Sequence, residues 1–271
     1  MWIDENKCKL CLVTSRSSDL IKLGKSEFLP QMLKIIASRL ENDRYTSRDE
    51  IFTQTFNDLK ELINDPDPYR GLKSSLNKLG KELAEVLRKE LQEKDWDIDL
   101  ALKFSVNANI IDTSVLGYEP KDLKEAIWDD PIKLGDVKIP EQERIYLVLD
   151  NSGEAYVDLL LAESLKRHGY DVKTVARSES YEIDITQGDM KVDITTPSNI
   201  PSVKFLNDGF IIAKGIANLE AYISINNPPP ALLLFRTKCD VLSFKFRVKK
   251  NTPIIATGEY ARKILLLSQP S

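Results

Sequence analysis

Two oxygen-bearing side chains, Asp150 and Asn151, directly follow an apolar run at residues 145–149. The continuous apolar character of this run is typical of a strand that is buried on both faces of a parallel sheet. Ser152 and Gly153 permit a tight turn, and helical spacing of apolar residues begins directly after it. A carboxylate and an amide at the end of such a strand, beside a helix N-terminus, suit a divalent cation, a phosphate group or both.

A simpler interpretation fits the same two residues. Asp150 could cap the following helix while Asn151 occupies the turn, because short polar side chains often accept hydrogen bonds from the free N–H groups at a helix start. The choice depends on whether other residues with suitable chemistry reach the same place.

Charged or amide side chains also follow the later apolar runs. Runs at residues 171–176, 209–213, 231–235 and 253–256 predict further strands, the last one at an edge of the sheet. Lys214 and Asn218 follow the second of these runs, and Lys238 follows the third. Because the carboxyl ends of parallel strands meet at one rim of a sheet, we expect these side chains to converge with Asp150 and Asn151.

Two further segments carry polar residues that could reach this rim. Asp184 lies near a turn in the segment 181–186 and offers a second carboxylate. Asn109 and Asp112 lie among apolar residues around the end of a predicted helix and could face the same cleft. Asn and Asp also commonly end helices, so this second pair is a weaker indication.

The elements that must position these residues divide the chain into two parts. Apolar residues recur at helical spacing in residues 28–40, 51–63 and 72–91, whereas strands and helices alternate after residue 140. We therefore predict an all-helical domain over residues 1–130 and an α/β domain with a mostly parallel sheet over residues 131–271.

Composition excludes several classes of protein. The chain has 271 residues and a net charge of -4, and its acidic and basic residues are interspersed, which argues against a general nucleic-acid binder. No apolar stretch is long enough to cross a membrane, and the start of the chain lacks the apolar core of a signal peptide. The single histidine, His168, excludes histidine-rich zinc catalysis. We expect a cytoplasmic protein that acts on a small molecule, without a membrane or nucleic-acid partner.

Three cysteines, an odd number, are typical of reduced thiols in a cytoplasm. Cys8 and Cys11 are three residues apart and would share one face of a helix. A structural zinc site needs four ligands, and only Cys239 remains to join them. We therefore favour packing or partial metal affinity over catalysis for this pair.

Four ordered motifs resemble the damage-control phosphatase family, also known as domain of unknown function 89. They are Asp150-Asn-Ser-Gly-Glu154, Ile-Asp184-Ile-Thr, Lys214-Gly-x-x-Asn218-x-Glu220 and Lys238-Cys239. Cys8-x-x-Cys11, Asp-Pro-Tyr69 and Asn109-x-x-Asp112 look like the compact, largely archaeal branch of the family. The resemblance spans nearly the whole chain and implies a Rossmann-like α/β/α domain beside an N-terminal helical domain.

The resemblance also implies an activity, namely hydrolysis of small phosphate monoesters such as sugar phosphates or damaged metabolites. It implies a divalent metal ion (Mg²⁺, Mn²⁺, Co²⁺ or Ni²⁺) held by Asp150, Asn151 and Asp184. Asp150, Asp184 and Lys238 are then the predicted catalytic residues. The residues assigned to substrate binding are Asn109, Asp112, Lys214, Asn218 and Glu220. Water and Asp150 both remain candidates for the nucleophile, and the oligomeric state is unknown.

The chain departs from the family pattern at two positions. Ala217 replaces the glycine that usually precedes the motif's Asn, and Ile183 replaces the Asn that usually precedes the third metal aspartate. If Asp184 is not a ligand, Asp189 and Asp193 are the alternatives.

Two other functions and one other type of phosphatase are alternatives to this assignment. A human relative is called acidic residue methyltransferase 1, which suggests S-adenosylmethionine-dependent carboxyl methylation, although the chain has no Gly-x-Gly turn for that cofactor. A non-catalytic module that binds phosphometabolites is the second alternative. A phosphatase of the haloacid-dehalogenase type is unlike this chain, because Ser152 stands where that family has its second Asp.

Overall fold

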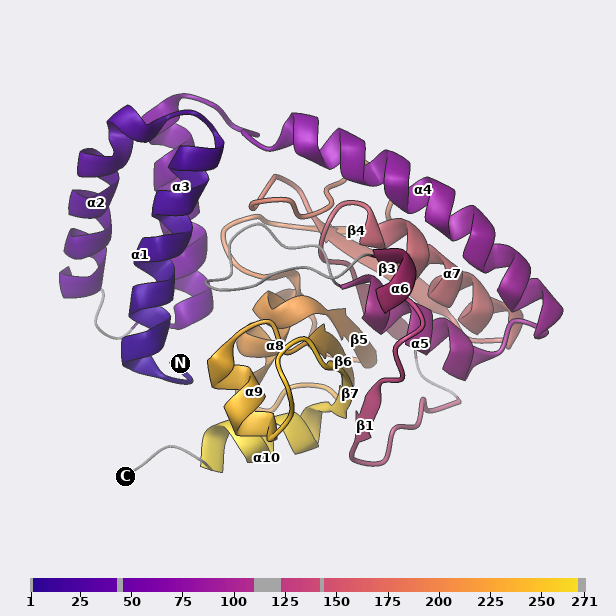
Figure 1. Ribbon diagram of the computed structural model, residues 1–271. Helices are drawn as coiled ribbons and strands as arrows, with labels where there is room; N and C mark the ends of the chain where they lie inside the picture. Colours follow the sequence, from indigo (N-terminus) through magenta and orange to yellow (C-terminus); the bar gives the residue numbers. More distant parts are fainter. Residues whose placement is uncertain (1, 43–45, 110–122, 142–143, 268–271) are drawn as a thin grey trace.

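The computed structural model describes residues 2–42, 46–109, 123–141 and 144–267 (Figure 1). The helices are α1 (Glu5–Lys22), α2 (Leu29–Asn42), α3 (Arg48–Ile63), α4 (Arg70–Glu93), α5 (Ile98–Ala108), α6 (Leu123–Ala126), α7 (Glu154–Arg167), α8 (Gly215–Ile223), α9 (Asp240–Phe246) and α10 (Gly258–Leu267). The strands are β1 (Ile132–Leu134), β2 (Ile145–Val148), β3 (Val172–Arg177), β4 (Ile194–Thr196), β5 (Phe210–Lys214), β6 (Ala231–Arg236) and β7 (Pro253–Thr257). Short 3₁₀ helices lie at η1 (Ser26–Phe28) and η2 (Ser202–Phe205).

Local sequence signals account for several of these element ends. Ser47 and Glu50 form a capping box at the start of α3, in which each side chain accepts a hydrogen bond from the other residue's backbone N–H. Asn64 ends α3 in the left-handed conformation, which Asn tolerates better than most residues. The Asp97 side chain caps α5 by accepting from the Leu100 N–H at 2.7 Å.

Within the described residues, the strands form one seven-stranded sheet in the order β1-β7-β6-β5-β2-β3-β4. All neighbouring pairs are parallel except β6 and β7, which are antiparallel. The predicted α/β class with a mostly parallel sheet is therefore confirmed. Strands β2 and β5 are neighbours, and the connections that follow them lead toward opposite edges of the sheet. Their carboxyl ends mark the switch point at which open α/β sheets bind ligands.

The edge of the sheet differs from the prediction. Residues 253–256 were expected at an edge, but β7 lies between β1 and β6. The edge strand, β1, has only three residues and is mostly exposed, so its sequence carries no buried apolar pattern. For the same reason the three-residue strand β4 at the opposite edge gave no signal.

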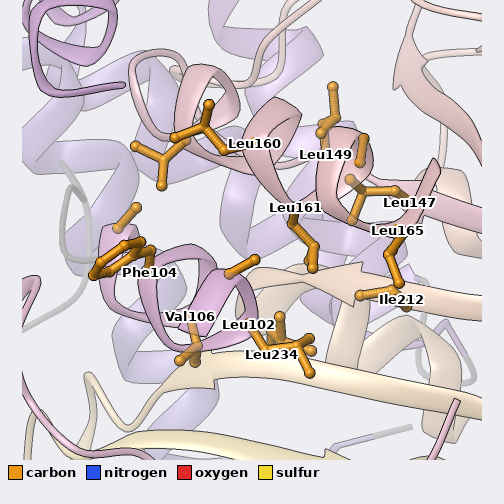
Figure 2. Close-up of a cluster of buried hydrophobic side chains, with 14 of the residues drawn as sticks. Leu102, Phe104, Val106, Leu147, Leu149, Leu160, Leu161, Leu165, Ile212 and Leu234 are labelled. Atoms are coloured by element: carbon orange, nitrogen blue, oxygen red, sulfur yellow. The ribbon is translucent and has the colours of Figure 1, made fainter. Parts of the chain in front are cut away.

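One face of the sheet is covered by α4, α5 and α7 (Figure 1). Figure 2 shows the apolar side chains that fill this layer. They come from α5 (Leu102, Phe104, Val106), from α7 (Leu160, Leu161, Leu165) and from the strands or their ends (Leu147, Leu149, Ile212, Leu234). Full burial of one such side chain contributes roughly 1.5–3 kcal/mol, so this layer holds the sheet and its helices together.

The opposite face of the sheet packs against α8, α9 and α10. Helices α1, α2 and α3 form a third apolar cluster, which also takes in Tyr69 and two residues that follow β3, Tyr181 and Ile183. The helical cluster is thus joined to the sheet through the loop that follows β3.

Helices α4 and α5 share the apolar core of the sheet rather than that of α1 to α3. The predicted boundary between residues 130 and 131 stays a prediction, because packing alone does not define an independently folding unit. Among the described residues, no helix has both the length and the apolar character that a membrane span requires.

Candidate active site

The turn that follows β2 is built differently from a simple helix cap. Helix α7 begins at Glu154, and its N-cap is Gly153, whose position carries no side-chain cap hydrogen bond. The Asp150 carboxylate instead accepts hydrogen bonds from Asn109 Nδ2 at 3.1 Å and from Asn151 Nδ2 at 3.2 Å. The interpretation of Asp150 as a mere helix cap is therefore wrong.

Helix α4 holds this turn from outside. The Gly153 N–H donates to Asn77 Oδ1 at 2.9 Å, and a Cβ at Gly80 would lie 2.0 Å from the Gly153 carbonyl oxygen. Gly153 has φ +85, and a Cβ there would lie 2.7 Å from the Leu76 carbonyl oxygen. The two backbones meet so closely that both contact positions require glycine.

The loop that follows β3 brings Asp184 to the same place. Backbone hydrogen bonds of 2.8 Å run from the Ser152 N–H to the Ile183 carbonyl and from the Ile185 N–H to the Asp150 carbonyl. An antiparallel bridge between Asn151 and Asp184 lies between them. These contacts place Asp184 beside Asn151 without any regular strand pairing.

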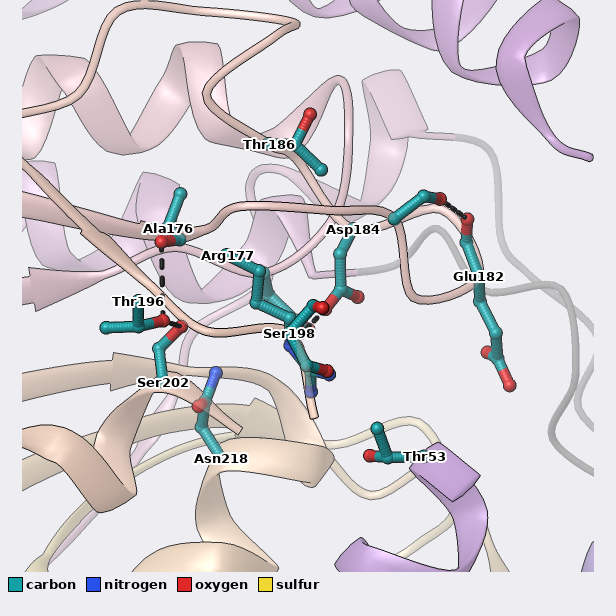
Figure 3. Close-up of polar contacts among 12 residues, drawn as sticks. Thr53, Ala176, Arg177, Glu182, Asp184, Thr186, Thr196, Ser198, Ser202 and Asn218 are labelled. Atoms are coloured by element: carbon teal, nitrogen blue, oxygen red, sulfur yellow. Dashed lines mark hydrogen bonds and ion pairs between the residues drawn. The ribbon is translucent and has the colours of Figure 1, made fainter. Parts of the chain in front are cut away.

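Asp184 also faces a cation. Arg177, the last residue of β3, approaches the Asp184 carboxylate with Nε 3.0 Å from Oδ2 (Figure 3). The Arg177 guanidinium lies over the Tyr181 ring at 4.7 Å from its centre. One carboxylate oxygen of Asp184 is therefore engaged by arginine.

The helical cluster anchors the same loop. Arg16 of α1 is fully buried, forms ion pairs with Asp19 and Glu182, and lies 5.0 Å from the centre of the Phe56 ring. Tyr181 and Ile183, which flank Glu182, belong to the apolar cluster of α1 to α3. The position of Asp184 therefore depends on packing against helices more than 100 residues earlier in the chain.

Neither alternative to Asp184 lies in the cavity at this rim. Asp189 accepts from the Thr186 N–H at 3.0 Å and forms an ion pair of 2.7 Å with Lys73. Asp193 accepts from the Thr174 N–H at 2.8 Å. Both carboxylates hold local structure.

A cavity of about 80 Å³ lies where these segments meet. Asp150, Asn151, Asp184 and Lys238 all line it, so the structure brings together the predicted metal ligands and the predicted catalytic lysine. Lys238 follows β6 and is almost fully buried. The cavity is large enough for a phosphate-sized group and lies at the strand switch point.

Sequence reasoning missed Arg48, which also lines the cavity. Its guanidinium forms an ion pair with Glu220 and lies 4.0 Å from the centre of the Phe52 ring. One signal was present in the sequence, because Ser47-x-x-Glu50 places Arg48 at the first position of a helix. A cation there opposes the helix dipole, which calls for a compensating reason.

The N-terminus of α8 forms another wall. Ile216 and Ala217 line the cavity, and Gly215 before them has φ +79. A Cβ at Gly215 would lie 1.7 Å from Asp150 Oδ2. Glycine therefore lets the helix start approach the Asp150 carboxylate, and free N–H groups at a helix start favour anions.

The residues assigned to substrate binding lie elsewhere. Lys214 is fully buried and binds Asp158 Oδ1 at 2.9 Å. Asn218 Nδ2 donates to the Lys214 carbonyl at 2.9 Å, and Glu220 pairs with Arg48. Neither these three nor Asn109 lines the 80 Å³ cavity. Asp112 lies outside the described residues, and all five substrate-binding roles stay predictions.

Asn109 has a clear structural contact. Its Nδ2 donates to Asp150 Oδ2 at 3.1 Å and to the two Glu154 carboxylate oxygens at 3.1 and 3.0 Å. Glu154 also accepts from the Asn151 N–H at 3.1 Å. Glu154 is thus a buried carboxylate next to the site that sequence reasoning named only as part of a motif.

Burial dominates the electrostatics of the cavity. Burial raises the pKa of Asp150 well above its ordinary value, the charges of Glu154 and Asp184 raise it further, and Lys238 opposes them. Burial also raises the pKa of Asp184 to about 7, against the opposing effect of Arg177. The carboxylates are therefore costly to ionise until a cation joins them.

The donor set suits a divalent cation. Asp150, Asn151 and Asp184 offer hard oxygen atoms from two carboxylates and an amide, as Mg²⁺ and Mn²⁺ prefer. In the described part of the chain, no cluster of three or more His, Cys, Asp or Glu side chains could hold a metal ion. A cation here would therefore need the amide and further oxygens from water or substrate, which agrees with the few protein ligands typical of Mg²⁺.

A mostly parallel α/β sheet with acidic and basic side chains around a cavity at its switch point is typical of an enzyme that handles charged small molecules. Residues 6–206 match the model of the damage-control phosphatase ARMT1-like domain, so the chain belongs to that family. The resemblance inferred from the motifs is confirmed. The matched region includes Asp150, Asn151 and Asp184 and ends before Lys214.

The curated relatives are archaeal. A damage-control phosphatase of Pyrococcus horikoshii is 27% identical over 76% of this chain and 79% of its own length. A damage-control phosphatase of Archaeoglobus fulgidus is 22% identical over 79% of this chain and 83% of its own length. The crystal structure of the family protein from Pyrococcus horikoshii superposes with a TM-score of 0.73 at 21% identity, covering 92% of this chain and 96% of the other. That likeness shows a shared fold.

Proposed function

We propose that this protein is a divalent-metal-dependent phosphatase that hydrolyses phosphate monoesters of small metabolites. Membership of the damage-control phosphatase family supports a phosphatase. The observation that carries the proposal is the cavity at the switch point, which is lined by Asp150, Asn151, Asp184 and Lys238. Cytoplasmic location and the absence of membrane and nucleic-acid partners remain predictions from the sequence.

The proposed reaction breaks the bond between phosphorus and the ester oxygen. An oxygen atom from water joins phosphorus overall, and the departing oxygen takes a proton to give an alcohol and inorganic phosphate. Lys238 and the N–H groups at the start of α8 would stabilise the negative charge on the phosphoryl oxygens. Asp150, Asn151 and Asp184 would hold the metal ion in the cavity that they line.

A divalent ion bound there would neutralise phosphate charge and supply Lewis-acid assistance. Asn109 would orient Asp150, because its Nδ2 donates to the Asp150 carboxylate. Arg177 would orient Asp184 in the same way, so each proposed ligand has a fixed partner.

A methyltransferase is less well supported by this geometry. Such enzymes usually bind their cofactor against a glycine-rich turn after a strand. Here the turn after β2 is covered by α4, with Asn77 and Leu76 in contact with Gly153. The backbone of that turn is therefore already occupied.

The experiment compares the parent protein with Asp150→Asn. We expect the parent to release phosphate from a panel of esters with Mg²⁺, Mn²⁺, Co²⁺ or Ni²⁺ and to stop in excess EDTA. Asp150→Asn should fold, bind the metal more weakly by calorimetry, and lose on the order of 10³-fold in kcat/KM.

Asp193→Asn is the matched control, because Asp193 is a hydrogen-bonded carboxylate outside the cavity. It should retain parent activity and metal affinity. Full activity of the parent in EDTA, or of Asp150→Asn with metal, would refute the metal site. Methyl transfer from S-adenosylmethionine without phosphate release would instead support the methyltransferase.

A further inference from the structure

A second cavity, of about 270 Å³, adjoins the catalytic cavity. It lies where the N-terminal part of α1 meets α8 and α9, an arrangement that Figure 1 shows. Cys11, Arg48 and Ile216 line both cavities, so the two spaces share a wall and meet at these side chains. A molecule with its phosphate in the smaller cavity would project the rest of its structure toward the larger one.

The walls of the second cavity are largely apolar. The aliphatic residues that line it are Ile3, Leu10, Ile216, Val241 and Leu242. All three cysteines of the chain, Cys8, Cys11 and Cys239, line it as well. Burial raises the pKa of the Cys8 and Cys239 thiols, which are therefore protonated near neutral pH and pack as small apolar groups.

The charged groups of this cavity are compensated or lie at its rim. Arg48 and Glu220 form an ion pair with each other. The side chains of Lys7 and Asp240 are 64% and 78% exposed, and Asp240 pairs with Lys250 at 2.8 Å. Apart from Arg48 and Glu220, whose Nε and Oε2 atoms have no hydrogen-bond partner among the described residues, the lining offers few interior groups for the many hydroxyl groups of a sugar, whose burial without partners is unfavourable.

We propose that the second cavity binds the alcohol portion of the phosphate ester, and that this portion is apolar rather than polyhydroxylated. This inference rests on the proposed phosphatase function and narrows its substrates from sugar phosphates to esters of apolar alcohols. It also gives the three cysteines a role in binding, although they come from opposite ends of the chain.

The test compares two primary alkyl esters of equal chain length, n-hexyl phosphate and a hexitol phosphate, in the presence of Mn²⁺ or Mg²⁺. Because both leaving groups are primary alcohols, the comparison isolates binding of the chain. Because burying several hydroxyl groups of the hexitol without partners is unfavourable, kcat/KM should be on the order of 10²-fold higher for n-hexyl phosphate. Equal values, or a preference for the hexitol ester, would overturn the inference and leave the phosphatase intact.

Two exposed apolar residues of α1 provide a matched pair of variants. Leu10 is 58% exposed and lines the cavity, whereas Ile21 is 61% exposed and does not. Leu10→Ser should lower the preference for n-hexyl phosphate roughly fivefold, and Ile21→Ser should leave it unchanged. Equal effects of the two variants would count against the cavity.

Cys239→Phe fills the second cavity from the side opposite Leu10. The ratio of kcat/KM for n-hexyl phosphate to that for the hexitol phosphate should then fall toward one, and circular dichroism checks that the variant is folded.

A binding measurement separates this inference from the phosphatase function on which it rests. Calorimetry should show tighter binding of n-hexylphosphonate than of methylphosphonate, because the hexyl chain reaches the second cavity. Tighter binding of n-hexylphosphonate, together with no release of phosphate from n-hexyl phosphate, would refute the phosphatase and support the apolar cavity. Equal affinities for the two phosphonates would refute the apolar cavity.

Discussion

The ends of β5 and β6 carry two lysines with opposite surroundings. Lys214 and Lys238 are 0% and 1% exposed, and they lie at the ends of two strands that pair in parallel, Lys214 as the last residue of β5 and Lys238 two residues after β6. Lys214 is held by Asp158 of α7 and by the Ser105 carbonyl of α5. Lys238 lines the catalytic cavity and lowers the pKa of Asp150. Convergence at one rim of a sheet therefore does not by itself place a side chain in the site.

The pleat of the strand explains the difference. Phe210 and Ile212 belong to the apolar layer beneath α4, α5 and α7, and Lys214 is two residues further along the same strand. Alternation by two directs Lys214 toward that same layer. Lys238 lies two residues beyond the end of β6, where the pleat no longer sets its direction.

The largest expected effect is on stability and comes from removing the buried ion pair between Lys214 and Asp158. Lys214→Met removes the cation that Asp158 binds and leaves a buried carboxylate without it, so the free energy of unfolding should fall by about 3–5 kcal/mol. Urea denaturation without metal measures this change. Lys214→Met combined with Asp158→Leu should recover much of the loss, and an unchanged midpoint for the single variant would contradict the structural role.

Lys238→Met should act on catalysis instead. Loss of its charge removes stabilisation of the phosphoryl oxygens, and kcat/KM should fall on the order of 10²-fold. The denaturation midpoint should change less than for Lys214→Met, because Lys238 lines the catalytic cavity, whereas Lys214 is enclosed between Asp158 and the Ser105 carbonyl. A variant with parent kcat/KM would show that Lys238 only fills the wall.

Gly215, which follows Lys214, tests the close approach of the start of α8 to the Asp150 carboxylate. Gly215→Ala should lower the free energy of unfolding by roughly 1–3 kcal/mol and reduce activity, because its Cβ would overlap the Asp150 carboxylate. Gly169→Ala is the control, since φ is +91 there and no atom lies within 4 Å of the new Cβ. If both substitutions have equal effects, backbone strain alone explains them and the close approach to Asp150 has no consequence.

The smallest expected effect concerns pH. Burial and the charges of Glu182 and Glu154 raise the pKa of Asp184 to about 7, while Arg177 and Lys73 oppose them. A carboxyl group with a higher pKa in the folded protein binds its proton more tightly when folded. Its stabilisation is complete below the unfolded pKa and is lost as pH rises through about 7.

We therefore expect the metal-free protein to lose stability as pH rises from about 4 to about 7 and to level off above that, and Asp184→Asn to flatten this dependence. Denaturation curves at several pH values measure it. Metal affinity should change in the opposite direction, because the ligands bind a cation when deprotonated. A parent protein whose stability does not fall over this range would contradict the raised pKa.

Much of the fold and part of the site follow from local sequence patterns. The apolar runs at β2, β3, β5, β6 and β7 are long enough to identify each strand, and the polar residues that end or follow the parallel strands β2, β5 and β6 mark one rim. Asp150, Asn151 and Lys238 reach one cavity because parallel strands end together. The short strands β1 and β4 could not be found in this way, since three residues carry no periodic signal.

The sequence by itself determined the strand ends, the glycines of the turns and the family, because these depend on neighbours along the chain. Only the tertiary structure decided that Arg48 lines the catalytic cavity and that Asp158 forms an ion pair with Lys214. It also decided that Cys239 lines the same cavity as the two cysteines of α1. These outcomes depend on contacts between segments that are far apart in sequence. Side-chain direction at such contacts is set by packing and by the pairing of buried charges, and local residue patterns do not encode either.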